Sequence, residues 1–336
     1  MARFSPVACK RSNDVRRDVL RGGAPLRAPA GIARAGLILA GCILAAQVAG
    51  AQQQDSVLRV CADPSNMPLS NRSGEGYENR IAQELANDLG RRVEYTYFPQ
   101  RIGFVRNTLR RKDAQTQQFE CDVIIGVPKG YELTATTQPY MRSTYALVFA
   151  WRKELDGVQA AEDLLKLPPE MLRTLRIGVF GRSPGADWLL RNGLLEHAVV
   201  YTPQSGDPDE SPAHVVEQDL ASGKIDMAIV WGPIAGFLVR RHAVFPAWRS
   251  APFMPDRQIK LDYEMSMGVR FGEKEWKAVL DDWISGHRDK IEQILTSYRV
   301  PLLDASGRLI AMQQTDEQAR AGGVRKDIPL RIEKRN

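Results

Sequence analysis

The sequence has little of what most catalytic or metal-binding sites require. Its 336 residues include only four histidines and four cysteines, and no group of them has metal-ligand spacing. The chain has no Cys-x-x-Cys pair, no Walker motif and no Gly-x-Gly-x-x-Gly motif after its first predicted strand, which argues against the usual redox and nucleotide sites. Ser183 has no evident His or Asp partner for nucleophilic catalysis. We therefore expect no catalytic residue, no metal and no cofactor.

Most of the chain also lacks net charge. The formal charge of +6 belongs to residues 1–51, which hold eight Lys and Arg but two Asp and Glu, while residues 52–336 hold 38 of each sign. A nucleic-acid-binding domain would show a basic excess on its folded part, so we expect no nucleic-acid partner. An apolar content of 43% suffices for one large or two medium domains.

Residues 1–51 are typical of an export signal peptide. A basic stretch that ends at Arg34 precedes an apolar run over 35–49, and the AGA tripeptide at 49–51 fits a signal-peptidase site. The LAGC tetrapeptide at 39–42 also fits a lipoprotein site, and an uncleaved anchor is a third option, although the run is short for a bilayer span. We favour cleavage after Ala51, which leaves no transmembrane segment in the mature chain.

Only two of the four cysteines remain after this cleavage. Cys61 and Cys121 lie in an exported chain, where an oxidising compartment favours a disulfide. The alternative is two free, buried thiols.

Alternating strand and helix patterns predict two similar α/β halves. We expect strands at 57–62, 92–98, 122–126, 145–149, 175–180, 198–201, 225–230 and 263–269, and helices at 78–89, 104–111, 186–191, 213–221, 234–241, 273–285 and 289–298. Residues 127–140 are polar and contain Pro and Gly, which predicts a loop after the third strand. Extended segments between the halves imply two lobes with a cleft between them. The predicted boundaries are 52–150 plus 262–310 for lobe one, 151–261 for lobe two and 311–336 for a polar tail.

Polar side chains at the predicted strand ends are candidates for the cleft, because ligands of open α/β sheets bind at the carboxyl ends of the strands. An ordinary structural role is the alternative for each: Asn66 could cap a turn, Asn79 and Ser183 could cap helices, and the arginines could pair on the surface. The candidates are Asp63, Asn66, Glu78, Asn79, Arg101, Pro128, Arg142, Ser143, Thr144, Arg182, Ser183 and Trp231.

Six motifs occur in order along residues 57–305: RVCADPSNMPLSN, GEGYEN, FPQRIGFVRNTL, CDVIIGVP, PYMRSTY and GKIDMAIVWGPIAGF. With them the chain resembles the type-2 periplasmic solute-binding proteins of extracellular family 3. It is similar, more specifically, to the MxaJ/XoxJ branch encoded beside PQQ-dependent methanol dehydrogenases. The resemblance implies the type-2 periplasmic binding protein fold, with two α/β lobes joined by two hinge crossings near Ala150 and Asp262. It also implies a periplasmic accessory protein that associates with and supports a PQQ-dependent alcohol (methanol) dehydrogenase.

Two departures from ordinary amino-acid receptors agree with this branch. Ordinary amino-acid receptors hold the ligand carboxylate with an arginine, and the corresponding position in this chain is Gly130. They hold the ligand ammonium group with an acidic residue, and the corresponding position here is Trp231. Carboxylate recognition depends on a charged fork and a buried ammonium needs a paired charge. A free α-amino acid is therefore a poor candidate ligand, although Lys129 or Arg142 could replace the arginine.

The resemblance leaves other functions open. The chain could instead be the solute receptor of an ABC importer for a small polar molecule, or an enzyme such as a dehydratase that uses Glu78 as acid or base.

In a binding-protein sheet of order 2-1-3, which the resemblance implies, the strands that carry Cys61 and Cys121 are neighbours. Adjacent strands lie about 4.8 Å apart, within reach of a disulfide.

Overall fold

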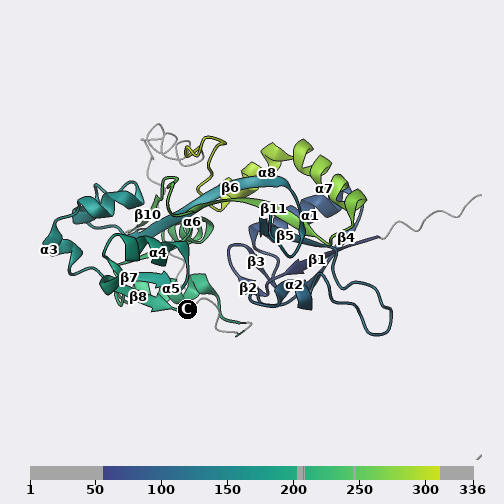
Figure 1. Ribbon diagram of the computed structural model, residues 1–336, viewed down its shortest axis with the longest axis horizontal. Helices are drawn as coiled ribbons and strands as arrows, with labels where there is room; N and C mark the ends of the chain where they lie inside the picture. The colour runs from purple at the N-terminus through teal and green to yellow at the C-terminus, as the bar shows by residue number, and fades with distance from the viewer. Residues whose placement is uncertain (1–55, 203–206, 208, 245–246, 311–336) are drawn as a thin grey trace, which may run out of the picture. The chain divides into compact units, whose positions relative to one another are not determined.

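A computed structural model describes residues 56–202, 207, 209–244 and 247–310 (Figure 1). Within these residues one sheet contains nine strands. In order across the sheet they are β4 (Arg92–Tyr97), β1 (Val57–Ala62), β5 (Val123–Pro128), β11 (Asp262–Val269), β6 (Ala135–Ala150), β9 (Met227–Trp231), β7 (Ile177–Phe180) and β8 (Ala198–Tyr201), while β10 (Trp248–Pro252) pairs with β6.

The long strand β6 connects two parallel groups of strands. Strands β4, β1 and β5 run parallel, in the predicted order 2-1-3, and so do β9, β7 and β8. The first part of β6 pairs antiparallel with β11 as far as Thr144, and from Tyr145 onward it pairs with β9 and β10. One continuous strand therefore belongs to both groups (Figure 1).

Helices cover each group of strands through amphipathic faces. Helices α1 (Tyr77–Asp88), α7 (Lys274–Gly286) and α8 (Arg288–Ser297) bury apolar residues against β1, β5 and β11. In the second group, α4 (Pro184–Arg191) packs in one apolar cluster, and α5 (Pro212–Ala221) with α6 (Gly232–Arg241) in another. The remaining helices are short: α2 (Phe104–Asn107), α3 (Pro169–Leu172) and 3-10 turns at Lys153–Leu155, Ala161–Lys166 and Leu195–His197.

Two expectations about residues 104–140 were wrong. The stretch 127–140 is mostly strand, because β5 extends to Pro128 and β6 begins at Ala135, where both pair with β11. Gly130 supplies the left-handed backbone of the connecting turn, with φ of 78°. The predicted helix at 104–111 ends at Asn107, because the backbone of Thr108 leaves the helical region with φ of −130°.

Three strands were not predicted at all. The edge strand β10 contains Pro252 and lacks polar/apolar alternation, so its sequence gives no strand signal. It is a strand because it pairs with β6. The hairpin of β2 (Ser65–Asn66) and β3 (Ser70–Asn71) is too short for a sequence signal. The expected export signal at 1–51 and polar tail at 311–336 lie outside the described residues. None of the helices within the described ranges is long and apolar enough to cross a membrane.

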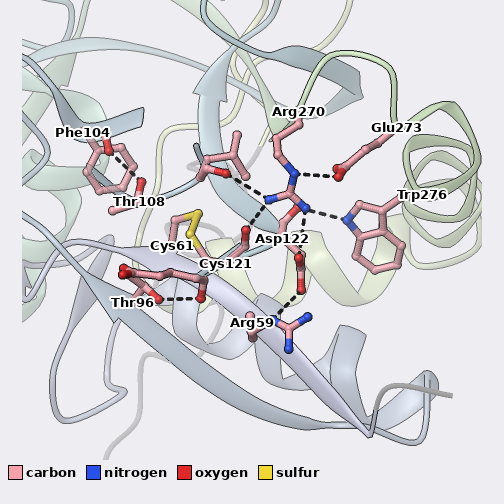
Figure 2. Close-up of a disulfide and its surroundings, with 12 residues drawn as sticks. Arg59, Cys61, Thr96, Phe104, Thr108, Cys121, Asp122, Arg270, Glu273 and Trp276 are labelled. Atoms are coloured by element: carbon pink, nitrogen blue, oxygen red, sulfur yellow. Dashed lines mark hydrogen bonds and ion pairs between the residues drawn. A yellow bond between two sulfur atoms is a disulfide. The ribbon is translucent and has the colours of Figure 1, made fainter. Parts of the chain in front are cut away.

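The predicted disulfide between Cys61 and Cys121 is confirmed (Figure 2). The two Cα atoms lie 5.4 Å apart, and β1 and β5 are neighbours there, as the sheet order required. Beside the bridge, Arg270 forms ion pairs with Asp122 at 3.0 Å and with Glu273 at 2.6 Å. It also donates hydrogen bonds to the carbonyl groups of Leu109 and Cys121. The disulfide and Arg270 together fix both ends of the segment between Leu109 and Cys121.

Candidate functional site

Some of the predicted cleft residues gather at the carboxyl end of β1. Asp63 follows this strand and accepts hydrogen bonds from the backbone N–H groups of Ser65, at 2.8 Å, and Gln100. Asn66 donates its side-chain amide to Oε1 of Gln100 at 3.1 Å. The loops after β1 and β4 are therefore tied together through Gln100. Burial raises the pKa of Asp63, although these two N–H donors oppose the rise.

Glu78 is a buried carboxylic acid, and one of its oxygens accepts no hydrogen bond from the described residues. It lies in the first turn of α1, is only 6% exposed, and its Oε1 has no hydrogen-bond partner within the described part of the chain. A Cβ atom at Gly126 would lie 2.1 Å from that oxygen, so any larger residue at this position of β5 would force the Glu78 carboxyl group to move. Burial, together with the negative charge of Asp63, raises the pKa of Glu78 to about 8. Glu78 is therefore mainly protonated at neutral pH.

Tyr140 lies close to the same point of β5, because a Cβ atom at Gly126 would lie 3.5 Å from its hydroxyl. Its ring is buried, its hydroxyl also has no hydrogen-bond partner among the described residues, and burial beside Glu78 raises its pKa. A neutral carboxyl and a phenol can each donate and accept a hydrogen bond. The pair thus keeps unused hydrogen-bonding capacity, and it carries no fixed charge at neutral pH. Sequence reasoning missed Tyr140 because it placed this residue in a polar loop.

Asn79 caps a helix, which was the structural alternative to a place in the cleft. Its Oδ1 accepts the backbone N–H groups of Asn71 and Gly76, both at 3.1 Å, which holds the start of α1. Ser183 likewise caps α4 by accepting the N–H of Ala186 at 3.3 Å. Arg182, the residue before it, is exposed and left-handed, with φ of 57°.

Three other candidates join β6 to neighbouring chain segments. Arg142 pairs with Asp262 at 2.7 Å. The buried hydroxyls of Ser143 and Thr144 donate to the carbonyls of Pro301, at 2.7 Å, and Leu261, at 3.1 Å. These side chains hold the point at which β6 passes from one group of strands to the other, and their hydrogen-bonding groups are already used.

The remaining candidates are separate from the Asp63–Glu78 group in their contacts. Arg101 lies over the ring of Phe98, 5.5 Å from its centroid, and Pro128 is exposed at the end of β5. Trp231 directly precedes α6 and packs edge-on against Tyr145 and Tyr263, with centroid distances of 5.5 and 6.0 Å. The structure therefore brings Asp63 and Asn66 together through Gln100, and Glu78 lies close enough to feel the charge of Asp63, whereas the other nine candidates have different contacts.

We predict that the common L-amino acids do not bind at physiological concentrations. The two cations that could replace the missing arginine are already paired: Lys129 with Glu264 at 3.0 Å and Arg142 with Asp262. Freeing either one would cost its ion pair, and Gly130 and Trp231 offer no charge instead. Titration calorimetry against the amino-acid set tests this, and micromolar binding of any member would contradict it.

The comparisons with known proteins agree with the two groups of strands and the altered anchor positions described above. No family model matches the chain. A curated relative, protein MoxJ of Methylorubrum extorquens, is 30% identical over 271 residues, which cover 76% of this chain and 85% of MoxJ. The crystal structure of the periplasmic binding protein XoxJ from Methylobacterium extorquens AM1 is 35% identical, with a TM-score of 0.58 over 74% of this chain and 99% of XoxJ. That of MxaJ from Methlophaga aminisulfidivorans MPT is 25% identical, with a TM-score of 0.60 over 73% of this chain and all of MxaJ. The chain thus belongs to the family of periplasmic binding proteins that includes MoxJ, MxaJ and XoxJ, and it has the type-2 periplasmic binding protein fold.

Proposed function

We propose that this protein is a periplasmic accessory protein that associates with and supports a PQQ-dependent alcohol (methanol) dehydrogenase. The observation that carries the proposal is its similarity to XoxJ over 99% of that chain. In this role the protein acts by contact with its partner and needs neither a catalytic residue nor a cofactor of its own. The PQQ belongs to the dehydrogenase.

The state of the amino-acid anchors supports this role over that of an amino-acid receptor. The carboxylate anchor is replaced by Gly130, in a turn where a Cβ would meet no atom within 4 Å. The ammonium anchor is replaced by the indole of Trp231, which packs against Tyr145 and Tyr263. An aromatic cluster at this position suits contact with a protein segment better than capture of a charged solute.

The two-lobe organisation is part of the proposal. We place lobe one at 52–150 plus 262–310 and lobe two at 151–261. The continuity of β6, which passes from one group of strands to the other between Thr144 and Tyr145, supports a first crossing that lies before the expected Ala150. The hydrogen bond of Thr144 to Leu261 supports a second crossing near Asp262. A type-2 fold with two crossings permits closure of the lobes, which could couple partner binding to the cleft.

A second candidate function is that of a solute receptor of an ABC importer. The neutral, buried Glu78 and Tyr140, each with an oxygen lacking a partner among the described residues, favour a small uncharged polar ligand. A solute that binds tightly, without any dehydrogenase binding, would establish this function instead.

We expect loss of dehydrogenase activity when the gene is deleted. Periplasmic dye-linked alcohol dehydrogenase activity should fall and return on complementation, because the partner lacks its supporting protein. The tagged protein should also co-purify the dehydrogenase at low salt. Unchanged activity together with no co-purification would exclude the accessory role and leave the receptor function as the better explanation.

A further inference from the structure

A cavity of about 490 Å³ is lined in part by Phe104, Val105 and Val127, which belong to the apolar cluster around the disulfide. Its lining comes from the loop before α2, from α2 itself, from Arg110 after α2, from the end of β5 and from the turn before β6. Three of the lining side chains are arginines, and none is an aspartate or glutamate. We call this surface the arginine face and define it as Arg101, Ile102, Arg106, Arg110, Tyr131 and Leu133.

The three arginines differ from the neighbouring Arg111. Arg111 pairs with Glu120 at 2.8 Å, but none of the three forms an ion pair with a described carboxylate. Arg101 lies over Phe98, Arg106 is exposed, and Arg110 donates to the carbonyl of Leu133 at 2.7 Å. In a mature chain with equal numbers of basic and acidic residues, this local excess of positive charge is complementary to carboxylates on a partner.

Large apolar side chains are exposed beside these guanidinium groups. Ile102 is 94% exposed and Leu133 43%. Phe271, 60% exposed, lies under the guanidinium of Arg110 at 6.0 Å from its centroid. Exposed aliphatic and aromatic groups next to arginine are typical of protein interfaces, where apolar anchors are surrounded by charged contacts. A merely solvated loop would not need these apolar groups.

The arginine face has a rigid base. Phe104, Val105 and Leu109 are buried in one apolar cluster with the Cys61–Cys121 disulfide. The hydroxyl of Thr108 donates to the carbonyl of Phe104 at 2.7 Å (Figure 2), and Arg270 donates to that of Leu109 at 3.0 Å. The side chains of 101–110 therefore alternate between an anchored inner set and an outer set of arginines. Pre-organised contacts lose less conformational entropy on binding.

We propose that the arginine face binds an acidic segment of a protein partner, in which two or more carboxylates flank an apolar side chain. The carboxylates would pair with Arg106 and Arg110, and the apolar group would contact Ile102 and Leu133. A free small anion would use the charges but leave the exposed Ile102 without a function. Insofar as the proposed function holds, this segment belongs to the dehydrogenase.

The test compares two double charge reversals of equal net charge. R106E/R110E reverses the arginine face, and R173E/R257E reverses two exposed arginines in other parts of the chain. The first probe is a fluorescein-labelled DELFED peptide with its uncharged counterpart NQLFQN, measured by anisotropy at low salt. We expect DELFED to bind the wild type about ten-fold more tightly than NQLFQN, and R106E/R110E to lose about ten-fold in affinity for DELFED, as loss of close charge pairs would produce. The control variant should match the wild type.

One further variant and a check of folding separate the explanations. Ile102→Ser should weaken DELFED binding while leaving the charges intact, and far-ultraviolet circular dichroism should show that each variant is folded. Equal DELFED binding by R106E/R110E and the wild type would overturn the proposal. Competition by free glutamate at the peptide's own concentration would also overturn it, because it would assign the site to a small anion.

The second probe is the purified PQQ dehydrogenase itself. If it binds the wild type and R106E/R110E equally well, the arginine face is not the docking surface, although the accessory function stands. If the dehydrogenase binds neither the wild type nor any variant, while DELFED still binds R106E/R110E more weakly than the control, the arginine face is an acidic-peptide site but the proposed accessory function is wrong. Loss of dehydrogenase binding in R106E/R110E alone would support both.

Discussion

Replacing Cys61 and Cys121 together by alanine should lower the free energy of unfolding by about 4 kcal/mol. The disulfide closes a loop with a sequence separation of 60 residues, and the cross-link restricts the unfolded chain more than the folded one. The two sulfurs also lie in the apolar cluster with Phe104, Val105 and Leu109, so their removal leaves space in that core. Urea unfolding followed by circular dichroism measures the difference.

The reduced wild-type protein is the control for the double cysteine variant. It keeps both sulfur atoms and lacks only the bond between them, so it separates the cross-link from the packing. We expect most of the loss to remain on reduction. A reduced protein as stable as the oxidised one would show that the cross-link contributes little. Because the same cluster supports the arginine face, reduction should also weaken DELFED binding.

Glu78→Gln should flatten the dependence of stability on pH. The pKa of Glu78 is about 8 in the folded protein, against its usual value of 4.5. Between these values the unfolded state releases its proton while the folded state retains it, so stability falls as the pH rises. Each pH unit in this window removes up to about 1.4 kcal/mol of folding stability. Glutamine has nearly the same volume and cannot ionise, so the variant should be more stable than the wild type at pH 8 and lack this part of the slope.

Urea unfolding from pH 5 to 8.5 tests this prediction. Glu132→Gln changes an exposed glutamate, and it should keep the wild-type slope. If Glu78→Gln gave the same slope as the wild type, Glu78 would not be the buried acid that we describe. The variant also tests the enzyme alternative, since an acid–base role for Glu78 requires that turnover disappear in Glu78→Gln.

The sequence alone determined the elements whose signal is local. Apolar β-branched runs predicted β1, β5, β7 and β9, and a 3.6-residue apolar periodicity predicted α1. These local patterns are sufficient because the spacing of apolar residues follows from which face of a strand or helix is buried. Export together with two remaining cysteines suggested the disulfide, and the strand order that the resemblance implied gave its geometry. The six motifs were specific enough to indicate the family before any comparison.

Only the tertiary structure decided which polar residues have already used their hydrogen bonds. Arg142, Ser143 and Thr144 were predicted for the cleft because they lie at the end of a predicted strand, but their partners are Asp262, Pro301 and Leu261, more than a hundred positions away. The burial of Glu78 against Gly126, and the length of β6, likewise depend on long-range contacts. Hydrogen bonding and desolvation act between groups that are close in space, so the chain's local pattern identifies candidate residues, whereas folding determines which of them keep a free polar atom.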